Sequence, residues 1–346
     1  MNDPRDPIAD LRRIAFLLER AQEATYRVQA FRKAAAALSK LDAESLVRRA
    51  FAGQLTELPG VGEVTARCVV ESLEGEVPVY LRRLEDTAEV PLDAATERLR
   101  QALRGDCHTH STWSDGGSPI DEMAMAARDL GHEYLVVTDH SPRLTVANGL
   151  SAQRLREQLV EVAARNAELV PFRILTGIEV DILDDGSLDQ EPELLAELDL
   201  VVASVHSGLR SPAAEMTKRM VAAVANPNVD VLGHCTGRKV AGRRRPESQF
   251  DAEAVFAACA EHGVAVEVNC RPDRLDPPKR LLRLAIEAGC LLAIDTDAHA
   301  PGQLDWQVLG CERAALCGAD VSHVVNAWPA ERLLAWTCHR TVGGPA

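Results

Sequence analysis

Two histidines one residue apart, His108 and His110, are the residues whose spacing first suggests chemistry. On a β-strand they would point to the same face, because residues i and i+2 of a strand share a face. Both imidazoles could then reach one metal ion. A His-x-His pair alone is weak evidence, since such pairs also arise by accident. Five later apolar runs also end in a histidine, an acid or both, and these runs give the pair its meaning.

From residue 105 onward, short apolar runs alternate with longer amphipathic ones, a pattern typical of βα units around a parallel sheet. We expect strands at 104–108, 134–138, 173–177, 198–204, 229–232, 264–269 and 291–294. We expect helices at 119–130, 151–169, 213–225, 251–261 and 278–288. Seven strands indicate an α/β fold, a distorted (β/α)7 barrel related to the TIM barrel. In such barrels the active site lies at the C-terminal ends of the strands.

Residues able to bind metal stand at these strand exits. The nine candidates are His108, His110, Asp115, His140, Glu179, His206, His234, Asp297 and His299. Nitrogen and oxygen ligands without thiolate suit Zn²⁺, Mn²⁺ or Fe²⁺ better than a structural cysteine-rich zinc site. Three divalent ions would leave positions open for water and substrate. Cys107 should point away from His108 on a regular strand, so neither Cys107 nor Cys235 is expected as a ligand.

This constellation resembles the polymerase-and-histidinol-phosphatase (PHP) domain, a family of metal-dependent phosphoesterases. The stretches GIEVDIL at 177–183, GHCTGR at 233–238 and RLD at 274–276 extend the resemblance to the PHP domain of bacterial and archaeal family X DNA polymerases. The resemblance implies one ion on His108, His110, Glu179 and Asp297. It implies a second ion shared by Glu179 with His206 and His234, and a third on Asp115, His140 and His299.

The first hundred residues predict a small helical unit, with helical spacing over 8–21, 26–41, 43–51 and 65–73. In the stretch LPGVG, Gly60 and Gly62 flank one apolar residue in a tight turn whose backbone N–H groups suit a phosphate. This stretch resembles a helix-hairpin-helix, which grips a DNA backbone, and an ordinary helix connector is the alternative. Arg67 on the following helix could contact phosphate or simply face solvent.

The helical unit also resembles the N-terminal domain of family X DNA polymerases. Cys68 stands where members with lyase activity carry a Schiff-base lysine, and a thiol cannot form that imine. We place the helical domain at 1–75, a connecting segment at 76–104 and the PHP barrel at 105–346. The connecting segment is too short for the nucleotidyl-transfer domain of a polymerase, so we do not expect DNA synthesis.

Composition sets further limits. Of the formal net charge of −14, residues 1–104 carry 16 basic and 17 acidic side chains, so the larger part is the acidic one. This charge argues against broad nucleic-acid affinity but allows a local DNA contact. Nine cysteines without regular spacing indicate reduced thiols. With neither a signal peptide nor an apolar run long enough for a membrane span, the sequence predicts a cytoplasmic protein.

Residues outside the ligand set could bind the substrate. The run RKVAGRRR at 238–245 follows His234 and should lie at the barrel mouth. Arg238 and Arg243 could there clamp a phosphate or a DNA strand, and an exposed basic loop is the alternative. Asn269 ends the sixth strand, which carries no ligand, and could contact the substrate.

We therefore predict a metal-dependent phosphoesterase that acts on DNA, as a 3′–5′ exonuclease or a 3′-end phosphatase. Metal-activated hydroxide would attack phosphorus, with Glu179, His206 and Asp297 as the catalytic ligands. The alternative enzyme is a small-molecule phosphomonoesterase, for example for histidinol phosphate or a nucleotide. A third hypothesis, a DNA-binding accessory whose barrel is only a scaffold, conflicts with the intact ligand set. The oligomeric state does not follow from the sequence.

Overall fold

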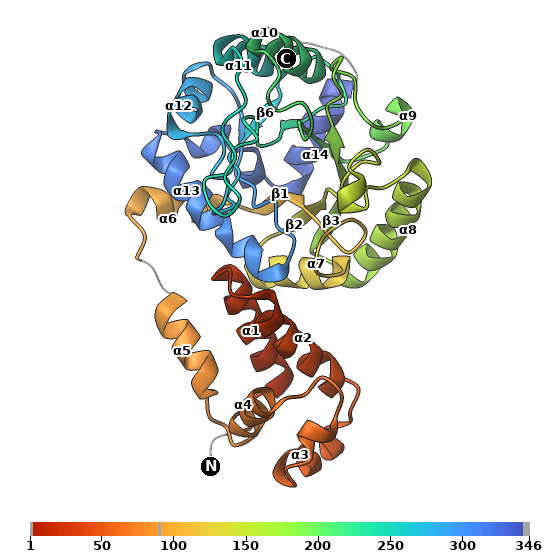
Figure 1. Cartoon of the computed structure of the whole chain (residues 1–346), viewed down its shortest axis with the longest axis vertical. Helices are drawn as coiled ribbons and strands as arrows, with labels where there is room; N and C mark the ends of the chain where they lie inside the picture. The colour runs from red at the N-terminus through yellow and green to blue at the C-terminus, as the bar shows by residue number, and fades with distance from the viewer. Residues whose placement is uncertain (1–2, 89–90, 342–346) are drawn as a thin grey trace. The chain divides into compact units, whose positions relative to one another are not determined.

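The computed structural model describes residues 3–88 and 91–341, and it divides the chain into two compact units, Met1–Pro91 and Leu92–Ala346 (Figure 1). Each unit has its own hydrophobic core. In the described residues the first unit is helical, and the second unit alternates strands with helices.

Amphipathic helices form the first unit. They are α1 (Pro7–Arg20), α2 (Thr25–Leu38), α3 (Ala43–Phe51), α4 (Glu63–Leu73) and α5 (Val79–Ala88), with a 3-10 turn at Leu55–Glu57. Asp6 and Asp42 begin α1 and α3 by accepting backbone N–H groups of the first turn. Leu11, Phe31 and Val69 lie in the core where α1, α2 and α4 pack together. The four helices predicted from apolar spacing are present, and α5 adds a fifth.

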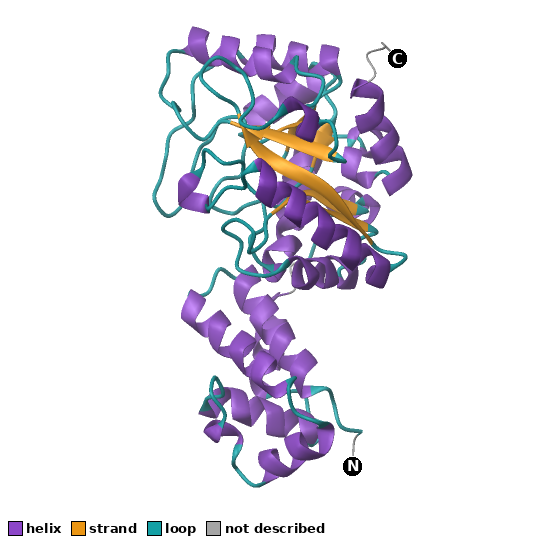
Figure 2. Ribbon diagram, turned by 90° about the vertical axis from the view of Figure 1, so that its right-hand side faces the viewer, coloured by secondary structure: helices purple, strands orange, loops and turns teal. Residues whose placement is uncertain are grey.

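A parallel sheet of seven strands forms the centre of the second unit (Figure 2). The strands are β1 (Gly105–Thr109), β2 (Tyr134–Val137), β3 (Arg173–Asp181), β4 (Leu200–Ser204), β5 (Val231–Leu232), β6 (Ala265–Glu267) and β7 (Leu292–Ala293). Their order in the sheet is their order in the chain. This is the arrangement of successive βα units around a barrel, and it confirms the predicted fold class.

Helices surround this sheet (Figure 1). They are α6 (Ala94–Ala102), α7 (Ile120–Asp129), α8 (Ala152–Leu169), α9 (Pro192–Leu195), α10 (Ala213–Val224), α11 (Ala252–His262), α12 (Lys279–Glu287), α13 (Gln307–Leu316) and α14 (Ala330–Thr341). Short 3-10 turns lie at Thr145–Ala147, Pro301–Trp306, Val321–His323 and Val325–Ala327. The helix α6 precedes the first strand and packs on α13.

The two edge strands approach each other and curl the sheet. A parallel bridge joins Thr109 to Ala298, and the His110 N–H donates to the Ala298 carbonyl over 2.8 Å. The Cys107 N–H donates to the Asp295 side chain over 2.9 Å. The chain segments after β1 and after β7, which both carry candidate ligands, therefore lie side by side.

A register shift in β1 changes what strand alternation implies for Cys107. The pairing of β1 with β2 shifts between Asp106 and Thr109, so regular alternation is interrupted there. Cys107 is buried with Val136 and Leu175 in an apolar cluster. The expectation that Cys107 would alternate strictly with His108 therefore does not apply to this strand.

The N-terminal ends of the strands enclose a tightly packed apolar layer. The Tyr134 ring fills this layer so closely that a Cβ on Gly105 would lie 2.2 Å from it. The Tyr134 hydroxyl donates to the Trp328 carbonyl over 3.2 Å, and Leu333 of α14 belongs to the same cluster. This end is closed by packing, which leaves the C-terminal ends of the strands for polar groups.

Several element boundaries differ from the sequence prediction. The strand β3 continues to Asp181 instead of ending at Gly177, because 177–181 pair with 200–204 of β4. Glu179 therefore lies inside a strand. The helices α9, α13 and α14 were not predicted. None of the helices within residues 3–88 and 91–341 combines the length and apolar character that a membrane span requires.

The burial of His132 in the second unit can be tested through the pH dependence of protein stability. Burial, assisted by the charge of Arg100, lowers the pKa of His132 to about 3 from an ordinary 6.5. Since the folded pKa is the lower one, unfolding takes up a proton below about pH 6.5, and stability falls as the pH drops from there toward 3. Replacing His132 by leucine should remove this loss.

We expect the unfolding free energy of His132→Leu, relative to the wild type, to rise by about 1.4 kcal/mol for each pH unit of acidification below about pH 6. Urea denaturation at several pH values measures this difference, in which the titration of all shared groups cancels. If the difference in unfolding free energy between His132→Leu and the wild type did not change with pH, the lowered pKa of His132 would be contradicted.

Candidate metal centre

All nine predicted ligands lie at the C-terminal ends of the strands. His108 is in β1 and Glu179 in β3, and the other seven follow strands within a few residues or stand in the loop after β1. Three groups have ligand atoms that lie within 4.8 Å of one another. They are His110–Asp115–His140–His299, His108–His110–Glu179 and His140–Glu179–His206. The fold thus brings together residues from distant parts of the sequence.

The Glu179 carboxylate is the centre of this cluster. Its Oε2 lies 3.3 Å from His108 Nε2, 3.5 Å from His110 Nε2 and 2.9 Å from His140 Nδ1. Its Oε1 lies 3.2 Å from the Nε2 of the fourth histidine, His206. A fifth imidazole, that of His234, approaches the same oxygen. With 1% of the side chain exposed, this carboxylate is surrounded by imidazoles instead of water.

His234 is the fifth imidazole, with its Nε2 2.9 Å from Glu179 Oε1. The carboxylate of Asp297 adds a second acid, and its Oδ1 lies 3.4 Å from His110 Nε2. Asp297 has a φ of +53°, a conformation that is uncommon for a residue with a Cβ and is found at functional sites.

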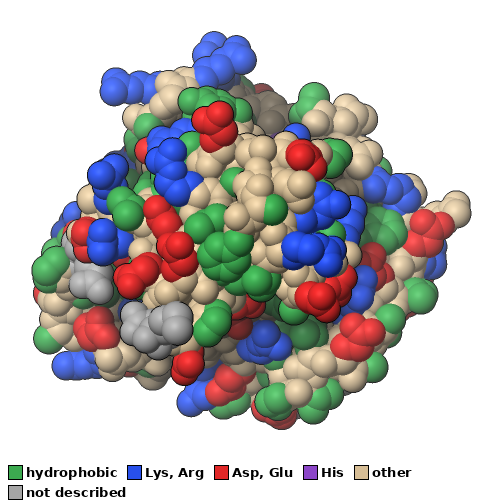
Figure 3. Space-filling view, turned by 90° about the horizontal axis from the view of Figure 1, so that it is seen from below, with side chains coloured by type: hydrophobic (Ala, Val, Ile, Leu, Met, Phe, Trp, Pro, Cys, Tyr) green, Lys and Arg blue, Asp and Glu red, His purple; other side chains and the backbone are tan. Residues whose placement is uncertain are grey.

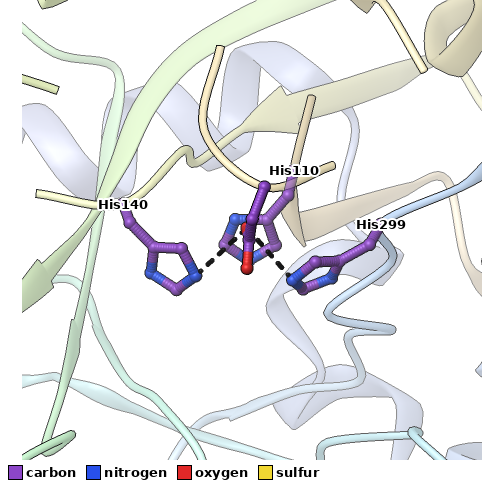
Figure 4. A group of neighbouring side chains, drawn as sticks. His110, His140 and His299 are labelled. Atoms are coloured by element: carbon purple, nitrogen blue, oxygen red, sulfur yellow. Dashed lines mark ion pairs between the residues drawn. The ribbon is translucent and has the colours of Figure 1, made fainter. Parts of the chain in front are cut away.

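Asp115 lies between two histidines at the more exposed side of the cluster. Its Oδ1 is 3.5 Å from His140 Nε2 and 3.4 Å from His299 Nε2. Figure 4 shows the rings of His140 and His299 on either side of the His110 ring. Asp115 is held there by its loop, since Asp139 accepts hydrogen bonds from Ser111 and Ser114 within it.

Two further acids contact the Nδ1 atoms of ligand histidines and so fix the orientation of the rings. Glu267 of β6 lies 2.5 Å from His108 Nδ1 and accepts the backbone N–H of His234. Asp181 contacts His206 Nδ1. When an acid takes the Nδ1–H, the proton stays on that nitrogen and Nε2 is left free as a ligand. Glu267 was missed in the sequence analysis, although an acid inside the apolar run 264–268 is an unusual feature.

The electrostatics of the cluster favour ionised acids and leave some imidazoles neutral. Burial opposes the charge of Glu179, but His108, His206 and His140 outweigh it and hold its pKa well below the usual range. Burial and the neighbouring His299 lower the pKa of His110 well below its ordinary value. Burial also opposes the charge of His206, yet Glu179 and Asp181 raise its pKa to about 9.

Several buried ligand atoms have no hydrogen-bond partner in the described part of the protein and would be satisfied by a metal ion. His108 Nε2, both ring nitrogens of His110 and Glu179 Oε2 make no hydrogen bond within the described residues. Buried polar atoms are normally satisfied, so atoms that converge without hydrogen bonds point to an absent partner. Their softness and charge match a divalent transition metal. Cys107 and Cys235 belong to none of the three ligand groups.

The three predicted substrate-binding residues occupy different environments. The Arg238 guanidinium donates to the carbonyls of Arg274 and Leu275. The Asn269 amide is fully buried and donates to Glu267 Oε2 and Asp297 Oδ2, each over 3.2 Å. Arg243 is exposed. Contact of any of these residues with a substrate stays a prediction.

The predicted hairpin of the first unit forms a turn before α4. Gly60 has a φ of +90°, which favours glycine, and a Cβ there would lie 3.3 Å from the Lys33 Cβ. Gly62 begins α4, and Thr65 Oγ1 accepts its N–H over 3.0 Å. Arg67 is exposed and lines a cavity of about 280 Å³ between α3, the 3-10 turn and α4. In Figure 3, basic, acidic and apolar side chains are interspersed on the visible face.

Cys68 of α4 is buried in the core of the first unit. Burial raises the pKa of its thiol to about 11. The side chain is therefore a neutral core residue, in agreement with the view that it does not take part in imine chemistry.

Comparison with known proteins identifies the family. The sequence profile of the PHP domain matches residues 106–271, and that of the helix-hairpin-helix domain matches residues 2–77. A protein of Thermoanaerobacter named "probable phosphatase" is 31% identical over 205 residues, which cover 56% of this chain and 78% of that protein. The chain belongs to the PHP domain family. At the level of the family, this confirms the expected class, a hydrolase acting on phosphate esters.

A second relative of this PHP protein is a longer, DNA-processing enzyme by name. The chain is 43% identical over 251 residues to the DNA polymerase/3′-5′ exonuclease PolX of Bacillus subtilis. The alignment covers 72% of this chain and 44% of that protein, so the chain spans less than half of its length. The match agrees with the resemblance to family X polymerases seen in the sequence.

A solved structure, histidinol phosphate phosphatase from Lactococcus lactis with zinc, L-histidinol and phosphate, is a more distant neighbour. It is 18% identical, with a TM-score of 0.46, and the alignment covers 63% of this chain and 95% of that one. This similarity is too low to support any conclusion about the site.

Glu267 provides a test of the metal centre in this PHP protein. Glu267→Gln should weaken metal binding about 10–100-fold, because the neutral amide orients and polarises His108 less strongly than the carboxylate. Competition for Mn²⁺ or Zn²⁺ against a chromophoric chelator measures the affinity. The matched control is Glu133→Gln, a substitution at an exposed acid that pairs with Arg104. Unchanged metal affinity in Glu267→Gln would refute the orienting role.

Proposed function

We propose that this PHP-family hydrolase is a metal-dependent phosphoesterase that acts on the 3′ ends of DNA, as a 3′–5′ exonuclease or a 3′-end phosphatase. The observation that supports this most strongly is the buried Glu179 carboxylate beside His108 and His110, whose Nε2 atoms make no hydrogen bond within the described residues. The DNA part of the proposal rests on the hairpin unit and on the relative named as a polymerase and exonuclease.

We assign three divalent ions to the nine ligands. His108, His110, Glu179 and Asp297 would hold the first, Glu179, His206 and His234 the second, and Asp115, His140 and His299 the third. Each compact ligand group corresponds largely to one proposed ion. The group His108–His110–Glu179 lies within the first ion's ligands, and the four-residue group contains all three ligands of the third ion. The remaining group shares Glu179 and His206 with the second ion. His140 is close to both Glu179 and Asp115, so it stands between two of the proposed positions.

The protein's own groups prepare the site for this chemistry. Divalent ions supply a nucleophile from water near neutral pH and neutralise charge on a phosphoryl group. Glu179 and Asp297 stay ionised because neighbouring imidazoles and guanidinium groups lower their pKa values against the effect of burial. Glu267 and Asp181 hold the rings of His108 and His206 in one orientation. The ligands are therefore preorganised, and little rearrangement is needed on binding.

DNA would bind through the hairpin of the first unit. Gly60 and Gly62 shape a turn at the start of α4, where backbone N–H groups and the helix dipole favour a phosphate. Arg67 is exposed near this turn and would add a charge-assisted contact. In the second unit, the exposed Arg243 would contact the DNA strand whose end enters the metal centre.

A small-molecule phosphomonoesterase is the second candidate function. The alignment with the protein named probable phosphatase covers 78% of that protein, and the excess of acidic residues in the larger part does not favour a polyanion. Histidinol phosphate or a nucleotide would be such a substrate.

One assay separates these functions. Full-length protein loaded with Mn²⁺ or Zn²⁺ is offered labelled single- and double-stranded DNA with 3′-hydroxyl or 3′-phosphate ends, beside a panel of phosphomonoesters. We expect hydrolysis at DNA 3′ ends to exceed that of the small esters. His110→Ala and Glu179→Gln should each reduce turnover by more than about 100-fold, beyond the usual effect of groups behind the ligands.

Glu133→Gln serves as the matched control and should leave turnover unchanged. Hydrolysis restricted to small phosphomonoesters would favour the second function. If none of these esters were cleaved after metal loading, the proposed function would be wrong.

The DNA contact gives a separate prediction. Arg67→Ala should weaken DNA binding and reduce the slope of log K against log salt by about 1, because one phosphate contact is lost. Fluorescence anisotropy over a salt series measures both quantities. Arg128→Ala on α7, an exposed arginine of the second unit, is the control. Equal salt slopes for Arg67→Ala and the wild type would exclude a phosphate contact at this position.

A further inference from the structure

Two arginines after β6, Arg271 and Arg274, flank the proposed metal ligand Asp297. Arg271 Nη1 lies 3.6 Å from Asp297 Oδ1, and Arg274 Nε lies 3.3 Å from Asp297 Oδ2. Arg271 Nη1 also lies 3.2 Å from the Nδ1 of His299, another proposed ligand. Both guanidinium groups therefore stand at the edge of the metal centre, although neither residue was singled out for this in the sequence.

Arg274 has buried donors that no protein acceptor satisfies. Its side chain is 11% exposed, and its Nε and Nη1 make no hydrogen bond within residues 3–88 and 91–341. A guanidinium carries five N–H donors in a rigid plane, and leaving such donors buried and unpaired is unfavourable. The nearby Asp297 contributes charge but not a hydrogen bond of suitable geometry. This arrangement calls for an acceptor from outside the chain.

The backbone around Arg274 is held firmly from the opposite side. Arg238 donates to the carbonyls of Arg274 and Leu275. Asp276 is fully buried and accepts hydrogen bonds from the hydroxyl of Thr236 over 2.6 Å and from its N–H over 3.1 Å. Thr236 follows the ligand His234 by two residues, so the arginine segment is fastened directly to the metal-ligand loop. The guanidinium is thus positioned before any ligand binds.

Arg271 is the outer member of the pair. Its side chain is 20% exposed, and its Nε donates to Asp273 over 3.2 Å. Arg271 is the more exposed and Arg274 the more buried of the two, so positive charge extends from the surface of the site toward Asp297. Planar guanidinium groups match the geometry of phosphate oxygens, which makes arginine the residue of choice for phosphate recognition.

We propose that Arg274, with Arg271 beside it, binds the non-bridging oxygens of the phosphoryl group that is hydrolysed. This inference rests on the proposed function, since it places a phosphate ester at the metal centre. In it, Arg238 acts on the scissile phosphate indirectly, because it holds the segment that carries Arg274.

If Arg271 and Arg274 had only a structural role, their replacement would have different effects. If the arginines only neutralised Asp297, their loss would change metal content or stability and leave the affinity for phosphate at the loaded site intact. The measurement must therefore separate phosphate binding from folding, from metal loading and from turnover.

The test compares Arg274→Met, Arg274→Lys and Arg271→Met in the full-length, Mn²⁺-loaded protein. Equilibrium titration with inorganic phosphate gives the affinity, and elemental analysis and thermal unfolding give metal content and stability. We expect Arg274→Met to bind phosphate at least about tenfold more weakly, with metal content unchanged. Arg271→Met should have a smaller effect, and Arg274→Lys should recover part of the loss because it keeps the charge.

The matched control is Arg100→Met. Arg100 is 18% exposed and pairs with Asp305 over 3.7 Å, so it resembles the test residues in burial but lies on α6, outside the site. We also expect added guanidinium ion to restore activity to Arg274→Met and not to His110→Ala.

Unchanged phosphate affinity in Arg274→Met, or a loss that follows metal content alone, would overturn the proposal. Wild-type protein that binds phosphate through Arg274 but hydrolyses no ester would refute the proposed function and leave Arg274 as a phosphate-binding residue. Failure of the two proposals is therefore distinguishable.

Discussion

The buried carboxylate of Glu179 is the constraint on which the rest of the site depends. An ionised acid removed from water is strongly unfavourable unless charges or hydrogen bonds compensate it. Five imidazole nitrogens stand between 2.9 and 3.5 Å from its two oxygens. They come from four different strands or their exits. The parallel sheet delivers them together because its strand ends meet at one edge, so in this fold the environment of Glu179 depends on the curled sheet.

This arrangement also determines where protons lie. Glu267 and Asp181 occupy the Nδ1 side of His108 and His206, while Glu179 faces their Nε2. In the metal-free protein these acids raise the pKa of both histidines against the effect of burial. A metal at the Nε2 side would displace the protons held there. Metal binding by this cluster is therefore coupled to proton release. The charge of Glu179 would then be compensated by the metal ion instead of by protonated histidines.

Sequence patterns predicted the fold class, and they marked the candidate ligands that the fold brings to one end of the sheet, because both leave local signals. Apolar runs marked all seven strands, and histidines stood in or shortly after five of them. The end of β3 was misjudged because Gly177 and Glu179 interrupt the apolar run, although pairing with β4 continues to Asp181. The shift in β1 has no signature in the residues themselves. It arises from the pairing with β2, which no local pattern records.

Glu267 and Arg274 were missed for a different reason. Each acts through a residue far away in the sequence: Glu267 through His108, and Arg274 through Asp297. Local spacing identifies a ligand that follows a strand, but it cannot identify the partner of that ligand across the barrel. For Glu267, the only signal was an acid within an apolar run. Arg274 lies in an irregular segment between β6 and α12 that has no periodicity to interpret.

The uneven charge of the chain shows how a phosphate ester could approach such a site. Residues 1–104 are nearly neutral, with 16 basic and 17 acidic side chains, and the remainder carries the acidic excess. An anion would be repelled by the larger part except where cations are concentrated. Within the site these cations are Arg271, Arg274 and any bound metal ions. Attraction is thus confined to the position where hydrolysis is proposed, and it falls off over about 8–10 Å at physiological salt.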